Sequence, residues 1–486
     1  MNALDAAASA HPDARALDDG RRQWTWSQLR DEALPLAAAL RSRHGLQSGD
    51  VVATCLPATA EHVLLLHAAW YAGLTVAPLH AGLPEAELRA RLAHLSPALL
   101  VAGDALPPGR TAVSMHELTD ASRSSPAAET ATALSAEPGN SDALCSILYT
   151  SGSSGAPHAV AHGWRQHRAA ASAAHANIPL GAGDCWQCVI PLHHIGGLAI
   201  LTRALFSGCA VRLHDGFDVD EVAAALRTDG VTVSSLVPTM LHRLLEADDA
   251  LRGDALPPLR AVLLGGAGAP DGLWQRIRAR DLPVVGTYGM TESCAQVATA
   301  DPLRWREEAG TAGRSLPGVQ MDIRDAEGRR CGSGDEGEIY LRGPMIADGY
   351  FRDPDATATA FKADWLATGD IGVLDRDGRL RVLARREDMI LSGGEKVYPA
   401  AVEAVLLRHA DVTDAAVVGI EDEEWGQRVA AAVVLRTDTD ISEVEAFCRA
   451  ELAAYQLPRI WRVLDALPRT ASGKILRGKL QEMIRA

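Results

Sequence analysis

The chain of 486 residues is 47% hydrophobic and carries 62 acidic against 47 basic side chains, a net charge of −15. It can bury the cores of two or three domains, and its acidic balance argues against nucleic acid as a partner, because a polyanion needs a basic face. It has no apolar run near the roughly 20 residues of a membrane helix and no signal-peptide core, so we expect a cytoplasmic protein without a membrane span. Eight scattered cysteines fit reduced thiols rather than a disulfide framework, and the composition leaves a homodimer open.

Helical and strand patterns alternate over the first hundred residues. An amphipathic helix runs through Leu29, Leu36 and Leu40. After it we expect strands at 51–56, 75–79 and 98–102, separated by helices at 61–72 and 85–95. This alternation predicts βαβ units and hence a parallel sheet. Residues 120–142 are rich in Ala, Ser, Thr and Pro without apolar periodicity, which predicts an exposed connector.

A loop of small hydroxyl side chains and glycines follows a predicted buried strand that ends at Tyr149. Glycines let the backbone approach a ligand, and hydroxyl and backbone N–H donors can surround an anion. The loop predicts a phosphate site; the alternative is a flexible linker, which rarely starts from a buried strand. It lacks the Lys-Ser/Thr ending of P-loop NTPases. The candidate phosphate-binding residues are Thr150, Ser151, Gly152, Ser153, Ser154 and Gly155.

A second α/β stretch runs from residue 189 to about residue 297. Cys185 and Cys188 just before it form a single Cys-x-x-Cys without a second pair at zinc-site spacing, so we expect both in a strand. Between residues 313 and 383 the segments become short, with Gly and Asp turns that predict antiparallel β structure.

The last hundred residues show the pattern of a small separate α+β unit. Its predicted helices are at 399–409 and 442–453, and its strands at 415–420 and 429–435. The predicted fold class is therefore α/β, with parallel α/β subdomains and a small β-rich subdomain in residues 1–384. A domain boundary is expected at 385–388, followed by the α+β unit over 389–486.

Six further motifs follow the loop in a fixed order. They are Gly-Gly-Ala at 265–267, Tyr-Gly-Met-Thr-Glu at 288–292, Thr-Gly-Asp at 368–370, Arg385-x-x-Asp388, Ser-Gly-Gly-Glu at 392–395 and Pro-Arg-Thr-Ala-Ser-Gly-Lys at 468–474. With these motifs the chain resembles, over nearly its whole length, the adenylate-forming superfamily of acyl-CoA synthetases, adenylation domains and luciferases. Within it, the chain is most similar to the o-succinylbenzoate-CoA ligases of menaquinone biosynthesis, on residues 185–186, 191–198, 264–266, 287–292 and 392–399.

The resemblance implies an AMP-forming acid-CoA ligase that uses ATP, Mg²⁺ and CoA. A carboxylate attacks the α-phosphate of MgATP to give an acyl-adenylate and pyrophosphate, and the thiol of CoA then displaces AMP. It also implies a mobile C-terminal domain that pivots at the boundary between the two steps. Three alternatives stay open: a ligase for other aryl or medium-chain acids, an adenylation enzyme that loads a carrier protein, and a non-catalytic adenylate-binding protein.

Two charged residues are the first candidates for catalysis. By the resemblance, the flexible ammonium of Lys474 bridges the reacting carboxylate and the α-phosphate, where negative charges meet. Glu292 is expected to hold Mg²⁺, a hard cation that takes carboxylate and phosphate oxygens, with a further oxygen from Thr150 or Thr291. The alternatives are a solvated surface lysine and an ordinary exposed glutamate at the end of a strand.

The other nucleotide contacts are expected along the same motifs. Asp370 would accept hydrogen bonds from the ribose hydroxyls, although Thr-Gly-Asp is also an ordinary turn. By the resemblance, Arg385 reaches the ribose too. Tyr288 offers a ring face to adenine, with plain core packing as the alternative. The set is completed by Gly266, Ala267, Gly289, Met290 and Thr291.

Three residues are candidates for binding the acid. In the family, the histidine at the position of His194 lies beside the reacting carboxylate, and we expect a bend at 195–197 to present its ring; the adjacent His193 makes the choice ambiguous. Arg203 interrupts an apolar helix, so its charge needs a partner, which we expect to be a second carboxylate of the substrate; the alternatives are an internal salt bridge and a side chain that extends to solvent. Gly265 completes the acid site.

The C-terminal motifs are assigned to CoA by the resemblance. A pivot at Glu387 would withdraw the lysine and bring a glycine-containing turn to the pantetheine arm, because glycines leave room for a thin ligand. The candidate CoA residues are Ser392, Gly393, Gly394 and Trp425.

One position departs from the family pattern of the loop. The usual Gly-x-Pro-Lys-Gly is replaced by Gly155-Ala-Pro-His-Ala159, so a cation that faces the pyrophosphate gives way to the mostly neutral imidazole of His158. We expect slower adenylation, unless the polyphosphate itself protonates the ring.

Overall fold

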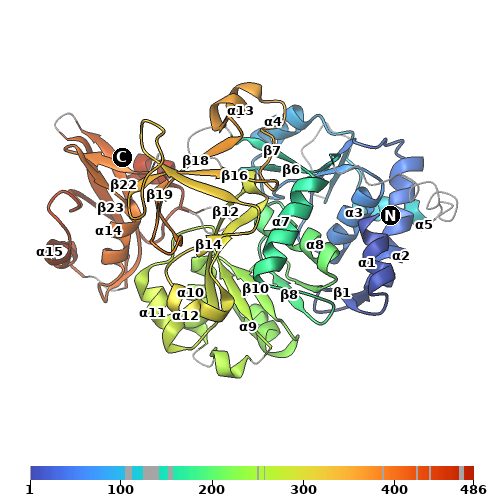
Figure 1. The fold of residues 1–486 in the computed structure, drawn as a ribbon, viewed down its shortest axis with the longest axis horizontal. Coiled ribbons are helices and arrows are strands. Elements are labelled where there is room, and N and C mark those ends of the chain that lie inside the picture. The colour runs from blue at the N-terminus through green and yellow to red at the C-terminus, as the bar shows by residue number, and fades with distance from the viewer. Residues whose placement is uncertain are drawn as a thin grey trace.

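The computed structural model describes residues 2–103, 112–123, 142–150, 157–248, 251–256, 258–385, 388–422, 425–436, 439–469 and 475–485. Figure 1 shows a large body that contains the N-terminus and a smaller body, orange to red, built from the C-terminal residues. Within those ranges, no helix is both long enough and apolar enough to cross a membrane.

The first sheet has five strands in the order β5-β3-β4-β6-β7; the first four are parallel, and β7 is antiparallel to β6. Its strands are β3 (Val51–Cys55), β4 (Thr75–Pro78), β5 (Leu99–Ala102), β6 (Leu144–Tyr149) and β7 (Ala159–Gly163). The helices of this region are α2 (Trp26–Ser42), α3 (Ala60–Tyr71), α4 (Glu85–Leu95) and α5 (Met115–Arg123). The hydroxyls of Thr25 and Thr59 start α2 and α3 by accepting hydrogen bonds from backbone N–H groups of the first turn.

The predicted βαβ units and parallel sheet are confirmed. The predicted connector at 120–142 begins too early, because α5 continues to Arg123. Residues 124–141 lie outside the described ranges.

The second sheet has nine strands in the order β14-β13-β12-β11-β10-β8-β9-β1-β2. Its strands are β1 (Arg15–Asp18), β2 (Gln23–Thr25), β8 (Cys185–Cys188), β9 (Ala210–Leu213), β10 (Val233–Leu236), β11 (Ala261–Leu264), β12 (Val284–Met290), β13 (Ala295–Thr299) and β14 (Arg314–Ser315). Its helices are α1 (Ala3–Ala10), α7 (Trp164–Asn177), α8 (Ile195–Ser207), α9 (Val219–Thr228), α10 (Pro238–Ala247), α11 (Asp271–Ala279) and α12 (Trp305–Glu308), with 3-10 turns η1 (Gly253–Ala255), η2 (Thr291–Ser293) and η3 (Pro302–Arg304). Cys185 and Cys188 are buried strand residues, as predicted.

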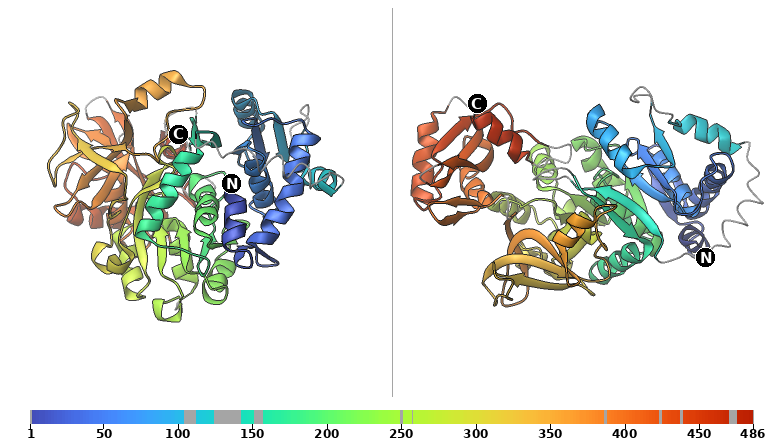
Figure 2. Two further views of the ribbon diagram at one scale, coloured as in Figure 1. Left: turned by 45° about the vertical axis from the view of Figure 1, so that its right-hand side comes forward. Right: turned by 90° about the horizontal axis from the view of Figure 1, so that it is seen from above.

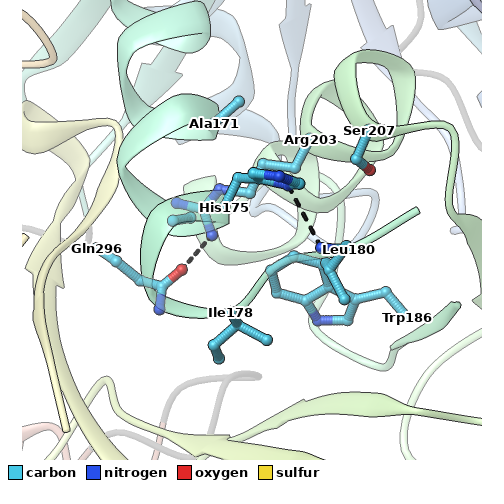
Figure 3. A pocket seen from close by; sticks show the side chains of 9 residues that line it. Ala171, His175, Ile178, Leu180, Trp186, Arg203, Ser207 and Gln296 are labelled. Carbon is cyan, nitrogen blue, oxygen red and sulfur yellow. Dashed lines mark hydrogen bonds between the residues drawn. The ribbon is translucent and has the colours of Figure 1, made fainter. Parts of the chain in front are cut away.

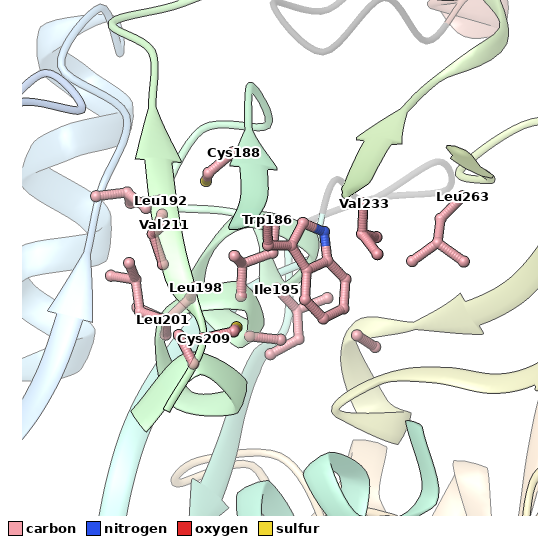
Figure 4. Close-up of a cluster of buried hydrophobic side chains, with 14 of the residues drawn as sticks. Trp186, Cys188, Leu192, Ile195, Leu198, Leu201, Cys209, Val211, Val233 and Leu263 are labelled. Carbon is pink, nitrogen blue, oxygen red and sulfur yellow. The ribbon is translucent and has the colours of Figure 1, made fainter. Parts of the chain in front are cut away.

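Helices α7 and α8 lie between the two sheets (Figures 1 and 2). Helix α7 contacts β6 and β7 of the first sheet and β13 of the second, and α8 contacts β8, β9 and β13. Because it is enclosed, α8 is apolar on nearly every side, and its Leu198 packs with Trp186 of β8 and Val211 of β9 in the main core (Figure 4). A polar side chain on α8 therefore sits in a dry environment.

The β-rich part of the chain is an antiparallel sheet, as predicted. It contains β15 (Gln320–Arg324), β16 (Glu336–Arg342), β17 (Phe361–Lys362), β18 (Trp365–Leu374) and β19 (Leu380–Arg385), with helix α13 (Pro354–Ala360) before β17. The chain leaves this sheet at Arg385, which makes β19 the last element before the predicted domain boundary.

The C-terminal residues form a five-stranded sheet with helices around it. The elements are β20 (Ile390–Ser392), β21 (Glu395–Val397), α14 (Pro399–Leu406), β22 (Val412–Asp422), β23 (Gly426–Leu435), α15 (Ile441–Glu451), β24 (Ile460–Val463) and α16 (Arg477–Arg485). Two small apolar clusters pack within this unit, separate from the main core. The Tyr398 hydroxyl donates to Glu336 Oε2 (2.6 Å), which links the unit to β16.

Candidate functional site

Two reciprocal hydrogen bonds close the base of the hydroxyl-rich loop. The backbone N–H of Thr150 donates to the carbonyl of His158 (2.8 Å), and the N–H of His158 donates to Thr150 Oγ1 (3.1 Å). The two bonds continue the antiparallel pairing of β6 and β7 on either side of the loop. Its phosphate-binding candidates at 151–155 lie outside the described residues.

The His158 side chain contacts the segment just before α13. Its Nδ1 lies 3.3 Å from Asp353 Oδ2, and its ring stacks on that of Tyr350 with centroids 4.5 Å apart and planes inclined by 25°. The imidazole that replaces the family's lysine thus has a carboxylate and an aromatic ring as neighbours.

Glu292 lies in η2, directly after β12, and only 6% of its surface is exposed. Its Oε1 accepts a hydrogen bond from the Tyr350 hydroxyl (3.0 Å), and its backbone carbonyl accepts one from the N–H of Ala347 (2.8 Å). Burial raises the pKa of this carboxyl above its ordinary value, while the positive charge of Arg385 opposes the rise. The alternative of an exposed surface glutamate is wrong.

Glu292 can bind Mg²⁺ only as one ligand among several, because the described residues supply too few ligands by themselves. No group of three His, Cys, Asp or Glu side chains in the described part of the chain is arranged to hold a metal ion. A magnesium ion here would take one protein carboxylate and complete its shell with phosphate oxygens and water, which is its usual mode at nucleotides.

Asp370 lies in β18, opposite Arg385 of β19. The Tyr288 hydroxyl donates to Asp370 Oδ2 (2.7 Å), and Arg385 Nε lies 3.2 Å from Asp370 Oδ1. Burial and the neighbouring carboxylate raise the pKa of Tyr288 well above its ordinary value, so the phenol stays protonated. The alternative of a simple Thr-Gly-Asp turn is wrong, because these residues belong to a strand in which Gly369 takes a left-handed φ of +71°.

Two of the predicted nucleotide or acid glycines are required by strand packing. A Cβ on Gly265 would lie 2.9 Å from the carbonyl oxygen of Thr287, and one on Gly289 would overlap the carbonyl of Ala295. Gly266 has a left-handed φ of +80°, which favours glycine. Gly265 and Gly289 therefore allow the close packing of β11, β12 and β13 in this region.

His194 is the residue before α8, and its carbonyl accepts the N–H groups of Gly197 and Leu198 (3.0 Å each). The predicted bend at 195–197 is wrong: these residues are the first turn of α8. Gly197 permits this turn because a Cβ there would overlap the carbonyl of Ile190. The glycine pair suggested a break in the helix, whereas it provides close packing at the helix start.

Two further histidine rings accompany that of His194. The His193 ring centroid lies 4.3 Å from that of His194 and 4.8 Å from that of His80. Burial lowers the pKa of His193 to about 3 and that of His194 to about 4, so both are neutral at neutral pH. Both side chains are half-buried, so His193 stays the alternative to His194.

Arg203 is 5% exposed on α8 and donates from Nη1 to Oε1 of Gln296 (Figure 3). Its Nε and Nη2 are buried and lack a hydrogen-bond partner among the described residues, and no described carboxylate pairs with it. Gln296 is itself fixed by donating from Nε2 to Thr299 Oγ1 (3.0 Å). The alternative of an internal salt bridge is therefore not supported by the described residues.

The Arg203 guanidinium lies beside an aromatic ring and a small cavity. Its central carbon is 5.7 Å from the centroid of the Trp186 ring, whose Nε1 donates to Ser235 Oγ (2.9 Å). The cavity of about 20 Å³ lies between α7, α8 and β8, with Arg203 and Gln296 in its lining (Figure 3). Burial lowers the pKa of Arg203 to about 10, so the group keeps its charge at neutral pH.

The CoA candidates lie around the β20–β21 hairpin. The space beside Gly393 is filled, because a Cβ there would lie 2.9 Å from Cε3 of Trp425. The N–H of Gly393 also donates to the Trp425 carbonyl (2.9 Å). Ser392 is buried, whereas Gly394 faces open space at a φ of +86°. In this arrangement the room expected for a thin ligand exists beside Gly394 and not beside Gly393.

Comparison with known proteins identifies the family. The family described as AMP-binding enzyme matches residues 4–351, and the AMP-binding enzyme C-terminal domain matches residues 401–474. The chain belongs to the AMP-binding enzyme family. It is 37% identical over 486 residues to the 2-succinylbenzoate-CoA ligase of Bacillus licheniformis, and the match covers 99% of each chain.

Solved structures of the AMP-binding family agree with this match. The o-succinylbenzoate CoA synthetase (MenE) from Bacillus subtilis, in complex with the acyl-adenylate intermediate OSB-AMP, superposes with a TM-score of 0.91 and 34% identity, covering 99% of this chain and 98% of that one. The same enzyme in complex with ATP and magnesium ion gives 0.90 and 33%, covering 99% of both. The resemblance drawn from the motifs is confirmed. The predicted adenylate-forming fold, with a large N-terminal and a small C-terminal domain, is confirmed too.

The structure brings part of the predicted site of this AMP-binding enzyme together. Arg385 and Asp370 both act electrostatically on Glu292, so the candidates for ribose and metal share one region. His194 directly precedes α8 and Arg203 lies within it, so one helix positions both candidates. Lys474 and Glu387 lie outside the described residues, so their roles stay predictions.

Sequence reasoning missed Tyr350 and Gln296. Tyr350 is 58 positions from Glu292 and Gln296 is 93 positions from Arg203, so no local pattern joins either pair. The available signal for Tyr350 was its position after Gly349 and just before the Asp353-Pro354 start of α13.

Proposed function

We propose that this enzyme joins o-succinylbenzoate to CoA through an acyl-adenylate, with release of AMP and pyrophosphate. The observation that carries the choice of acid is Arg203, a buried charged guanidinium with two nitrogens that lack a partner among the described residues. A buried charge is costly without a counter-charge. The proposed acid has two carboxylates, one that reacts and one on the benzoate ring that can pair with this cation. The names of the similar proteins support the same acid.

Helix α8 sets the distance between the two groups that would bind the two carboxylates of such an acid. His194 and Arg203 are nine residues apart, or about 13.5 Å along a helix axis. Long side chains on a helix lean toward its N-terminus, so the guanidinium lies closer to His194 than its backbone does. We place the reacting carboxylate near His194 and the benzoate carboxylate at Arg203, with Gly265 beside the acid. The cavity beside Arg203 is smaller than an aromatic ring, so side chains around it must shift on binding.

The nucleotide is placed on the other side of the reacting carboxylate. Asp370 accepts hydrogen bonds from the ribose hydroxyls. Arg385 and Tyr288 hold the Asp370 carboxylate in place. The β11–β12 backbone, with Gly266, Ala267, Gly289, Met290 and Thr291, borders the base and the α-phosphate, and residues 150–155 take the other phosphates. Glu292 would hold Mg²⁺ together with phosphate oxygens, and the ion would supply positive charge against the phosphates.

The C-terminal domain is proposed to serve the two steps in two orientations. In the first, Lys474 places its ammonium between the carboxylate and the α-phosphate, which stabilises the charge that develops as pyrophosphate leaves. In the second, a pivot at Glu387 within 385–388 removes the lysine and presents Ser392, Gly394 and Trp425 to CoA. Trp425 would move away from Gly393 if CoA passes at that position.

The test is a ligation assay with a panel of acids. The enzyme is incubated with MgATP, CoA and either o-succinylbenzoate, benzoate or a medium-chain fatty acid, and thioester and AMP are measured by mass spectrometry. We expect o-succinylbenzoyl-CoA and AMP in equal amounts. Preference for another acid would refute the assigned substrate, and adenylate without any thioester would point to carrier loading.

Cellular location and assembly belong to the same proposal. We place the enzyme in the cytoplasm, where its substrates ATP and CoA are available, and a homodimer is compatible with it. Cell fractionation and sedimentation of the purified protein test these two statements.

A further inference from the structure

A row of three side chains connects the base of the hydroxyl-rich loop to the metal candidate. The His158 ring stacks on Tyr350, and the Tyr350 hydroxyl donates to Glu292 Oε1 at 3.0 Å. His158 directly precedes β7, Tyr350 lies in the segment before α13, and Glu292 lies in η2. These three segments are far apart in the sequence. They span the region between the predicted polyphosphate and its counter-ion.

Contacts of both its backbone and its ring hold Tyr350, and they restrict the position of its hydroxyl. Its backbone bridges Val160 of β7, and its N–H donates to Thr357 Oγ1 at 2.9 Å. Its ring lies between that of His158 and that of Phe361, which meets it edge-on at 5.8 Å. A hydroxyl fixed in this way can fix the group to which it donates.

The imidazole of His158 is 44% exposed and contacts Asp353 as well as Tyr350. Its Nδ1 lies 3.3 Å from one oxygen of Asp353, whose other oxygen accepts the N–H of Ala356 at the start of α13. A planar ring can cover the face of Tyr350 in a stacked arrangement, which a lysine ammonium cannot do with the same geometry. At this position the chain has exchanged a mobile cation for a packed ring.

We infer that His158 and Tyr350 are positioning residues: Tyr350 orients the Glu292 carboxylate for the Mg²⁺ of bound MgATP, and the His158 ring holds Tyr350 in place. The inference rests on the proposed function, because it needs a metal-bound nucleotide at Glu292. Side chains that hydrogen-bond a metal ligand set its direction, and their loss commonly weakens metal binding by about 10- to 100-fold. Binding of ATP without metal, or of AMP, does not depend on this carboxylate.

The experiment measures nucleotide binding to the full chain by calorimetry, with no acid present. ATP is titrated with Mg²⁺ and again with EDTA, and AMP is titrated as a metal-independent ligand. Tyr350→Phe removes only the hydroxyl and should lower the gain in ATP affinity from Mg²⁺ by about tenfold. His158→Ala should lower it by about threefold, whereas His158→Phe keeps a stacked ring and should stay within twofold of the parent.

Tyr71→Phe is the matched control, because its hydroxyl donates to the Asp5 carboxylate at the same distance of 3.0 Å far from the site. It should leave the magnesium effect unchanged. Unchanged AMP affinity in each variant shows that the nucleotide site is folded. A parent enzyme without any magnesium effect would overturn the metal site at Glu292 itself. A normal parent with an unchanged Tyr350→Phe variant would overturn only the positioning role, and equal losses in His158→Phe and His158→Ala would overturn the stacking.

Discussion

The proposed nucleotide region and the proposed acid region of this enzyme differ in how their charged groups are paired. In the nucleotide region, the carboxylates of Glu292 and Asp370 each accept a hydrogen bond from a tyrosine, Tyr350 and Tyr288. In the acid region, Arg203 donates to one neutral amide and has two nitrogens without a partner in the described chain. Both regions are buried, so the difference does not come from exposure to water.

The contrast indicates two ways to prepare a binding site. Carboxylates whose directions are already fixed need little rearrangement when a nucleotide binds. A buried cation without a counter-charge is destabilising until an anion binds to it. Such a cation therefore selects acids that carry an additional anionic group. Under the proposed function, the first region serves a substrate common to the family, and the second distinguishes this enzyme's acid.

Lys474→Ala tests the charge stabilisation that we propose between the reacting carboxylate and the α-phosphate. We expect formation of the acyl-adenylate to fall by about 100-fold or more, because the ammonium stabilises charge that develops only in the transition state. Transfer from a supplied acyl-adenylate to CoA should survive. Pyrophosphate release and thioester formation are measured separately, and equal loss of both steps would contradict the two-orientation scheme.

A buried ionisable group outside both binding regions should affect stability and not binding. His67 of α3 is such a group. Burial lowers its pKa to about 4 from an ordinary 6.5, so protonation favours the unfolded chain as the pH falls from 6.5 to 4. Between pH 8 and pH 5 this one group removes about 2 kcal/mol of the free energy of unfolding. His67→Leu should reduce the loss by about that amount in urea melts at the two pH values. An unchanged difference between pH 8 and pH 5 would show that His67 is not buried as a neutral ring.

Tyr288→Phe tests whether the tyrosine bond prepares Asp370. The variant removes the 2.7 Å hydrogen bond and leaves Arg385 as a contact of the carboxylate. Because a hydrogen bond to a charged group contributes about 1.5 kcal/mol or more, AMP and ATP affinity should fall about tenfold, while the constant for the acid changes little. Equal weakening of acid and nucleotide would indicate general damage to the core instead.

The sequence predicted the layers of the fold more completely than the contacts of the site. Buried strands and amphipathic helices have distinct apolar periods, so their alternation over residues 25–102 can be recognised in the sequence. That alternation predicts βαβ units and hence parallel strands. The glycines at 196–197 misled, since their role in packing against Ile190 depends on a distant backbone. Tyr350 and Gln296 were missed for the same reason: each finds its charged partner only after the chain folds. Arg203 was found because a charge in an apolar helix is already unusual in the sequence.

The most direct test of the account is whether Arg203 recognises a second carboxylate. The catalytic efficiency kcat/KM is compared for o-succinylbenzoate and 4-oxo-4-phenylbutanoate, which lacks the benzoate carboxylate, in the parent enzyme and in Arg203→Ala. The parent should prefer the dicarboxylate by about 1.5–3 kcal/mol, and the variant should lose that preference with little change in the ATP constant. An equal preference in parent and variant would contradict the central claim.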